Sequence, residues 1–234
     1  MADVSTLKVD MHSHLIPGID DGVNNIEDAV VILKRMQQLG YEKVITTPHI
    51  MADVYLNNPD VINNGLQELK TALQIADVDI VVEAAAEYCL DDGFSKHLEN
   101  NNLLTLKDNY LLVELPYFSV PPDFYENLFE LQINKYKIIL AHPERYAFWY
   151  NDFSKLEDLK IRDVLFQINM ISLTGYYSNA VKKVTEKLID LGMVDFAGSD
   201  IHNIPYLEKF ENSLYMPYLE KLLDSGKLKN SLLL

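Results

Sequence analysis

Seven short runs of mostly apolar residues recur along the chain, separated by longer segments of mixed polarity. Runs that are apolar at nearly every position are typical of strands buried on both faces of a parallel sheet. The strands predicted in this way span residues 7–11, 43–47, 80–88, 110–115, 137–141, 165–170 and 194–198.

The segments between these runs carry apolar residues at the helical period. The clearest spans residues 27–39, where one face collects Ala29, Ile32, Leu33, Met36 and Leu39. Asn24 or Asn25 can cap the start of this helix, and Gly40 can end it in the left-handed conformation. Further helices are predicted over residues 60–75, 123–134, 178–191 and 206–224, with Gly192 closing the third of these.

Repeated alternation of strand and helix predicts an α/β fold of parallel strands joined by right-handed crossovers. The sheet is either an open doubly wound sheet or a closed barrel. None of the nine glycines belongs to a dinucleotide fingerprint or a Walker-type loop, which weakens the open alternative. A barrel mouth also gathers residues from many strand ends more easily. With no linker or repeat, the expectation is one domain over residues 1–234.

Composition narrows the possible partners and compartment. The chain has 35 acidic and 20 basic side chains and a formal net charge of −15. Such a surface repels phosphate backbones and anionic lipid, so neither nucleic acid nor a membrane surface is expected as a partner. A single cysteine, Cys89, favours a reducing compartment. Without a signal peptide or a membrane-spanning apolar run, the protein is expected to be cytoplasmic.

Five of the six histidines follow the carboxyl ends of predicted strands, where active sites of α/β folds lie. Carboxylates occupy equivalent places, so the candidate ligands are His12, His14, Asp21, His49, Glu87, Glu114, His142, Asp200 and His202. His97 is the exception and is expected at the surface, beside the Asn-rich segment 99–102. Glu83 lies on the same strand face as Glu87, either as a supporting partner or as an acid paired within the barrel.

Imidazole and carboxylate ligands without a thiolate cluster suit divalent ions such as Zn²⁺, Mn²⁺ or Fe²⁺. His12 and His14 flank Ser13 and can reach one ion, because alternate residues of an extended segment project to the same side. Nine ligands exceed the shell of one ion, so two or three metals are expected, with Glu87 as a bridge. The alternative is a solvated polar barrel mouth without metal.

Clustered divalent ions activate water and clamp the oxygens of a phosphoryl group, and their positive charge favours an anionic substrate. Arg145, three residues after His142, is the one arginine at this edge and can hold two phosphate oxygens. Its alternative role is an ion pair with Glu144 or Asp152. A cysteine-dependent phosphatase is excluded because Ser95 stands where its arginine is required, which leaves Cys89 as a small packed residue.

The motifs occur in an order typical of one protein group. They are Asp10-Met11-His12-Ser13-His14, Gly18-Ile19-Asp20-Asp21-Gly22, Thr47-Pro48-His49, Ala86-Glu87-Tyr88, Val113-Glu114, His142-Pro143-Glu144-Arg145-Tyr146 and Ser199-Asp200-Ile201-His202-Asn203. From about Val9 to Asn203 the sequence resembles the polymerase-and-histidinol-phosphatase (PHP) superfamily. Within it, the sequence is most similar to the metal-dependent tyrosine phosphatases of bacterial capsule and exopolysaccharide operons, the CpsB/YwqE type.

The resemblance implies a distorted (β/α)7 TIM-like barrel with a centre of three metals, commonly manganese, iron or zinc. It assigns His12, His14, Glu87 and Asp200 to one ion. Glu87 then shares a second ion with Glu114 and His142, and Asp21, His49 and His202 hold the third. The implied enzyme is a hydrolase in which a metal-bridging hydroxide held by Glu87 attacks phosphorus while Arg145 binds the phosphate. The implied substrate is phosphotyrosine on a membrane tyrosine kinase of polysaccharide export.

One feature departs from the family pattern. Relatives carry a second phosphate-binding arginine soon after the Asp-x-His motif, whereas residues 203–209 contain none. Either Lys209 substitutes for it, or Arg145 and the metals suffice. The alternatives to a tyrosine phosphatase are a phosphatase of small esters such as histidinol phosphate, a DNA exonuclease, which the net charge disfavours, and a non-catalytic metal-bound scaffold. The sequence leaves open the oligomeric state, and whether residues 231–234 pack on the barrel or on a partner.

Overall fold

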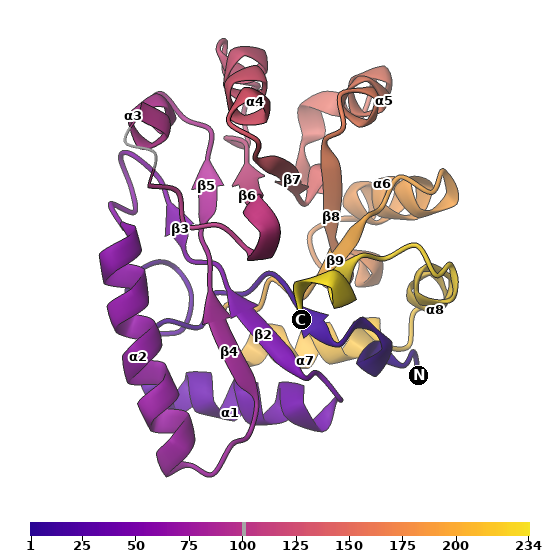
Figure 1. Cartoon of the computed structure of the whole chain (residues 1–234). Helices are drawn as coiled ribbons and strands as arrows, with labels where there is room; N and C mark the ends of the chain where they lie inside the picture. Colours follow the sequence, from indigo (N-terminus) through magenta and orange to yellow (C-terminus); the bar gives the residue numbers. More distant parts are fainter. Residues whose placement is uncertain (100–101) are drawn as a thin grey trace.

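The computed structural model describes residues 1–99 and 102–234, and its strands form two parallel sheets with helices around them (Figure 1). One sheet has the order β1 (Val9–Asp10), β2 (Lys43–Thr46), β4 (Val81–Ala84). The other has the order β3 (His49–Ile50), β5 (Glu87–Cys89), β6 (Tyr110–Glu114), β7 (Lys137–Ala141), β8 (Leu165–Asn169), β9 (Phe196–Gly198). The predicted α/β fold with parallel strands is confirmed.

One predicted strand is divided in two by a short break, and another is followed by a short strand that was not predicted. Residues 43–47 continue past Pro48 into β3, and residues 80–88 are divided between β4 and β5. Backbone bonds from Ala85 N to the Thr46 oxygen (3.0 Å) and from Glu87 N to the Pro48 oxygen (3.1 Å) hold the segments together across the break. The register that follows pairs His49 with Glu87, so two predicted metal ligands become direct neighbours.

Four predicted helices are present within one or two residues of their expected ends: α1 (Ile26–Gln38), α2 (Pro59–Ile75), α4 (Phe124–Ile133) and α6 (Asn179–Asp190). Of the two expected caps for α1, Asn25 is the one used, and its side chain accepts a hydrogen bond from Asp28 N at 2.8 Å. Gly40 follows the helix with φ +95°, the left-handed conformation expected there. In the described part of the chain, no helix is long and apolar enough to span a bilayer.

The single helix predicted over residues 206–224 is wrong, because the chain forms α7 (Ile204–Ser213) and α8 (Pro217–Asp224). Proline disfavours helical backbone in the residue before it, and Met216 is accordingly extended, with ψ 126°. Two other helices, α3 (Phe94–Glu99) and α5 (Ser154–Ile161), lie where none was predicted. Each buries only two apolar side chains, too few to show a helical period.

The chain ends beneath the strands, at the opposite end from the histidines. Leu233, in the short 3-10 helix η6 (Asn230–Leu233), is fully buried among Val9, Met11 and Phe196. The Asn230 amide donates to the backbone oxygens of Val9 (3.0 Å) and Ala197 (2.7 Å), and so links β1 to β9. Of the C-terminal leucines, Leu233 therefore packs on the strands of its own chain.

Candidate metal centre

All nine predicted ligands lie at the carboxyl ends of the strands and in the loops that follow them. They form four overlapping groups whose ligand atoms lie within 4.8 Å of one another: His14, Asp21, His49 and His202; His12, His14 and Asp200; His12, Glu87 and His142; His49, Glu87 and Glu114. Because each group shares a member with another, the four groups make one continuous cluster.

Glu87 stands at the centre of this cluster, at the start of β5. Its Oε2 lies 3.2 Å from His12 Nε2 and 3.2 Å from His49 Nδ1, and its Oε1 lies 3.0 Å from His142 Nε2. The carboxylate is fully buried. A carboxylate whose two oxygens face different imidazoles has the arrangement that bridging between neighbouring cations requires.

Asp200 joins His12 and His14 just after β9. Its Oδ1 lies 3.2 Å from His12 Nε2 and 3.4 Å from His14 Nε2. The backbone here is left-handed, with φ +54° at Asp200, and a second ligand, His142, has φ +35°. Such conformations cost about 1–3 kcal/mol and cluster at functional sites. A bond from Asp200 N to the His12 oxygen, at 2.8 Å, holds the turn beside the opposite strand.

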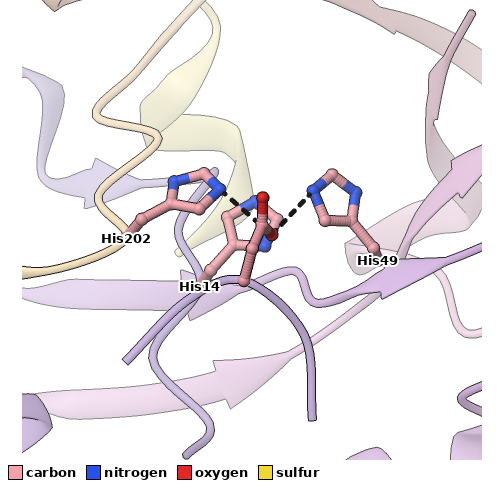
Figure 2. A group of neighbouring side chains, drawn as sticks. His14, His49 and His202 are labelled. Atoms are coloured by element: carbon pink, nitrogen blue, oxygen red, sulfur yellow. Dashed lines mark ion pairs between the residues drawn. The ribbon is translucent and has the colours of Figure 1, made fainter. Parts of the chain in front are cut away.

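A third part of the cluster surrounds Asp21, in the loop after β1. Figure 2 shows His14, His49 and His202 close together, and its dashed lines mark the ion pairs made by His49 and His202. Asp21 Oδ1 lies 3.4 Å from His49 Nε2 and 3.5 Å from His202 Nε2. His14 belongs to this group as well as to that of Asp200, so it lies between two of the sites that the family resemblance implies.

Glu114 provides a test of whether the residues fit a cation. Both of its carboxylate oxygens are buried, and neither has a hydrogen-bond partner among the described residues. Two imidazole nitrogens lie close to it, His49 Nδ1 at 3.0 Å and His142 Nε2 at 3.8 Å. A buried anionic group without hydrogen bonds is costly unless a cation neutralises it. The environment of Glu114 therefore fits a divalent ion held by oxygen and nitrogen ligands.

The charges within the cluster are strongly coupled. Burial raises the pKa of Glu87, but the positive charges of His12 and His49 outweigh this and hold the pKa well below its usual value. Burial and His14 lower the pKa of His49, but the carboxylates around it, Glu87 first, outweigh them and raise that pKa to about 10. These shifts favour the protonated form of His49 beside ionised Glu87, and metal binding requires release of that proton.

Three polar residues that were not predicted from the sequence orient the candidate ligands through hydrogen bonds. Asp20 Oδ2 lies 2.8 Å from His14 Nδ1, and Gln167 Oε1 lies 2.8 Å from His12 Nδ1. Asn169 accepts a hydrogen bond from the Gln167 amide (2.9 Å) and donates one to Asp200 Oδ2 (2.6 Å). The only sequence signal for them was adjacency: Asp20 precedes Asp21, and Gln167 and Asn169 alternate along a predicted strand.

Arg145 lies at the edge of the cluster, in the short 3-10 helix η3 (Pro143–Arg145). Its Nη1 lies 3.4 Å from Asp200 Oδ2, so the alternative of an ion pair with Glu144 or Asp152 is wrong. Glu144 is buried and instead accepts hydrogen bonds from Asn169 N (2.9 Å) and Ser172 Oγ (2.8 Å). A pocket of about 470 Å³ opens between Arg145 and the ligands.

Other candidates lie outside this pocket. Glu83 is half exposed and forms an ion pair at 2.7 Å with Lys43, which also donates to the Leu233 oxygen, so Glu83 is a paired acid and not a partner of Glu87. His97 is half-buried, and its ring lies edge-on to that of Tyr88, so it is more enclosed than the surface position predicted for it. Residues 100–101 of the neighbouring Asn-rich segment lie outside the described residues. Cys89 is buried, as expected. Lys209 is exposed on α7 and does not line the pocket.

Known proteins of one family are similar to this chain over most of its length. Residues 8–225 match the family model for capsular polysaccharide synthesis, CpsB/CapC. The putative tyrosine-protein phosphatase CapC of Staphylococcus aureus is 31% identical over 231 residues, which cover 94% of this chain and 90% of CapC. The tyrosine-protein phosphatase YwqE of Bacillus subtilis is 28% identical over 197 residues, covering 84% of this chain and 78% of YwqE.

Solved structures give the same result. A structure from work on YwqE of Bacillus subtilis and CpsB of Streptococcus pneumoniae, described as metal-dependent tyrosine phosphatases, superposes with a TM-score of 0.82 at 26% identity, covering 96% of this chain and 93% of its own. A phosphotriesterase homology protein of Escherichia coli shares the fold alone, with a TM-score of 0.54 at 13% identity, covering 97% and 94%. The family match spans nearly the whole chain, and the chain therefore belongs to the CpsB/CapC family of capsular polysaccharide synthesis proteins.

Proposed function

We propose that this protein is a metal-dependent protein tyrosine phosphatase. The observation that carries the proposal is the convergence of nine imidazole and carboxylate ligands into one cluster, with Arg145 beside it on the wall of the same pocket. Relatives of similar length are named tyrosine-protein phosphatases, which supports the choice of phosphotyrosine over other phosphate esters.

The ligands are proposed to hold two or three divalent ions, with manganese, iron and zinc as candidates. His12, His14, Glu87 and Asp200 would bind one ion, and Glu87 would share a second with Glu114 and His142. Asp21, His49 and His202 would bind the third, to which His14 also lies close. Bound ions of this kind activate water as a nucleophile and stabilise the negative charge of a phosphoryl group.

The protein's own groups would position the substrate. Arg145 lines the pocket near Asp200, and its planar guanidinium can donate two hydrogen bonds to phosphate oxygens. Tyr55 and Tyr176 also line the pocket and would flank an aromatic ring. Phe118 follows the lining residue Tyr117 and is 96% exposed. An exposed apolar side chain beside the pocket favours a protein substrate over a small ester.

The proposed partner is the cytoplasmic tail of a membrane tyrosine kinase of capsule or exopolysaccharide biosynthesis, and the proposed compartment is the cytoplasm. Support comes from the family match to capsular polysaccharide synthesis proteins. The pocket itself supports one part of this proposal, namely that the substrate is a phosphotyrosyl segment of a protein that extends from the mouth of the pocket.

We further propose that the two sheets form one distorted (β/α)7 barrel and that residues 1–234 are a single PHP-type domain. Contacts between the first and last strands support this. His14 N donates to the Ile201 oxygen at 2.9 Å, and Ser199 Oγ donates to Asp10 Oδ2 at 2.7 Å. With the Asn230 link below them, these contacts would take the place of a regular ladder between β1 and β9.

The test of the function is turnover of a phosphotyrosyl peptide by the purified chain before and after metal removal. We expect exhaustive chelation to abolish turnover and Mn²⁺ or another divalent ion to restore it, with Glu87→Gln reducing both metal content and turnover at least 100-fold. Histidinol phosphate, assayed in parallel, should be the poorer substrate. Full activity after elemental analysis shows no metal would refute the proposal, and faster turnover of histidinol phosphate would reassign the substrate.

A further inference from the structure

Arg145 is the only lysine or arginine that lines the pocket among the described residues. Among the same residues its hydrogen bond is to Asp200, through Nη1, so the other guanidinium N–H groups remain for a ligand. A long, freely rotating side chain would lose much entropy when it binds a phosphate. What holds this single cation in place therefore affects how well the pocket binds an anion.

Two tyrosine rings contact the guanidinium. Its central carbon lies 4.7 Å from the centroid of the Tyr117 ring and 4.4 Å from that of the Tyr177 ring. The two tyrosines come from different loops, one after β6 and one before α6. Contacts of this kind attract a cation to the ring face and restrict its rotation. The Arg145 side chain is only 22% exposed as a result.

A third tyrosine fixes the second ring. The hydroxyl groups of Tyr177 and Tyr206 are hydrogen-bonded, and Asn169 Nδ2 donates to the Tyr177 hydroxyl at 3.2 Å. Tyr206 stands in the first turn of α7, where its backbone N–H donates to the capping side chain of Asn203 at 2.9 Å. Tyr177 is thus tied to a helix start on one side and to the residue that orients Asp200 on the other.

We propose that Tyr117, Tyr177 and Tyr206 form a tyrosine cage that positions Arg145 for binding a phosphate group. The inference rests on the proposed function. Within it, the three tyrosines are positioning residues that act through Arg145. One pre-positioned guanidinium, together with the metal cluster, would then suffice to bind the anion in a pocket whose described lining holds no second lysine or arginine.

The first experiment measures binding of inorganic phosphate to the full chain loaded with Zn²⁺, by calorimetry. Replacing a ring that contacts the cation, in Tyr117→Leu or Tyr177→Leu, should weaken phosphate binding about 2- to 30-fold, the range of one cation–ring contact. Tyr117→Phe keeps its ring and should bind within twofold of the unmodified protein. Tyr206→Phe loses only the hydroxyl group that links it to Tyr177, and its loss of phosphate binding should be smaller than that of the leucine variants. Tyr177→Phe also loses a hydrogen bond to Asp200 (3.4 Å), so its zinc content must be measured before its phosphate binding is compared.

A matched control is provided by Tyr125 on α4 and Arg162, the residue that follows α5. Tyr125 contacts Arg162 in the same way, with the guanidinium carbon 5.2 Å from the ring centroid, but neither residue lines the pocket. Tyr125→Leu should leave phosphate binding unchanged. Zinc content measured on every variant separates positioning from damage to the metal cluster. Loss of zinc together with phosphate binding in both leucine variants would overturn the cage as a positioning device.

A second measurement follows Arg145 directly. The chain has three arginines, so their side-chain N–H signals in a spectrum of ¹⁵N-arginine-labelled protein are few enough to resolve. The Arg145 signal should show the relaxation of a rigid group and should become mobile in the two leucine variants, while that of Arg162 loosens only in Tyr125→Leu. An Arg145 signal that is equally mobile in the unmodified protein and in the two leucine variants would refute the proposal.

The outcomes distinguish this inference from the function on which it rests. The cage would be refuted, and the function left intact, if the unmodified protein turns over a phosphotyrosyl peptide and both leucine variants keep normal phosphate binding and an unchanged KM. Absence of turnover in the unmodified protein, with phosphate binding that depends on the rings, would refute the function and support the cage. If both proposals hold, the leucine variants should raise KM more than they lower kcat.

Discussion

The histidines of the cluster are oriented through their second ring nitrogen. His14 contacts Asp20 through Nδ1 at 2.8 Å, which turns Nε2 toward Glu87 and Asp200. His12 contacts Gln167 through Nδ1 and turns Nε2 toward the same two acids. Partners of this kind fix the tautomer and the direction of an imidazole ligand. The geometry of the candidate centre therefore depends on residues that would not themselves touch a metal.

Asp20→Asn tests this dependence at the scale of one residue. The amide keeps the size of the side chain but removes the charge that faces His14, so we expect metal affinity to fall about 10- to 100-fold. The measurement is competition with a chelator of known affinity, followed by elemental analysis. Asp53→Asn, an exposed aspartate in the loop after β3, removes the same charge and should have no effect. Equal affinities for the two variants would contradict the assigned role of Asp20.

At the scale of elements, β9 approaches the opposite strand too closely for any side chain at Gly198. An added Cβ would lie 2.8 Å from both His12 Cβ and Gln167 Nε2. The glycine is thus required by packing, since it lets the strand end lie against the ligand His12 and the residue that orients it. The same element then delivers Asp200 and His202 into the cluster.

Gly198→Ala should therefore impair stability and metal binding together. Overpacking of a buried site costs about 1–3 kcal/mol, and displacement of His12 should lower metal affinity as well. Urea unfolding of the metal-free protein and metal titration measure the two effects separately. In Gly226→Ala the Cβ meets nothing within 4 Å, but the φ of +65° adds strain, so this control should lose stability without losing affinity. Unchanged metal affinity in Gly198→Ala would show that His12 does not depend on this contact.

At the scale of the whole molecule, the two chain ends and the strands stabilise one another below the metal cluster. Leu233 is fully buried among side chains from β1, β2 and β9, and Lys43 donates to its backbone oxygen at 2.7 Å. The neighbouring leucines are much more exposed, with 53% for Leu232 and 41% for Leu234. Only the middle leucine of the final three therefore belongs to the core.

Leu233→Ala should lower the free energy of unfolding by about 2–5 kcal/mol, the usual cost of truncating a buried leucine. Leu232→Ala makes the same chemical change at an exposed position and should cost less than about 0.5 kcal/mol. Denaturant titration of metal-free protein compares the two without the contribution of bound ions. Similar losses in both variants would mean that the C-terminus is anchored differently in solution.

Sequence patterns predicted the strands and the helices α1, α2, α4 and α6 well, because their apolar positions recur at the period of the element. The break between α7 and α8 was missed because the helical pattern of apolar residues continues across Pro217, although this proline disfavours helical backbone in the residue before it. The nine ligands were identifiable because histidines and acids stood at equivalent places after successive strands. Their supporting partners were not, because Gln167 and Asn169 look like ordinary polar strand residues until the neighbouring strands are known.

The sequence by itself determined the α/β class and the set of side chains that we propose to bind metal, because periodicity and residue type are local properties of the chain. Only the tertiary structure decided how those ligands are shared. It placed His49 beside Glu87 and Glu114, and His14 between two groups. It also brought three tyrosines together around Arg145. These pairings join loops far apart in the chain, so they depend on strand order and register, which no single segment encodes.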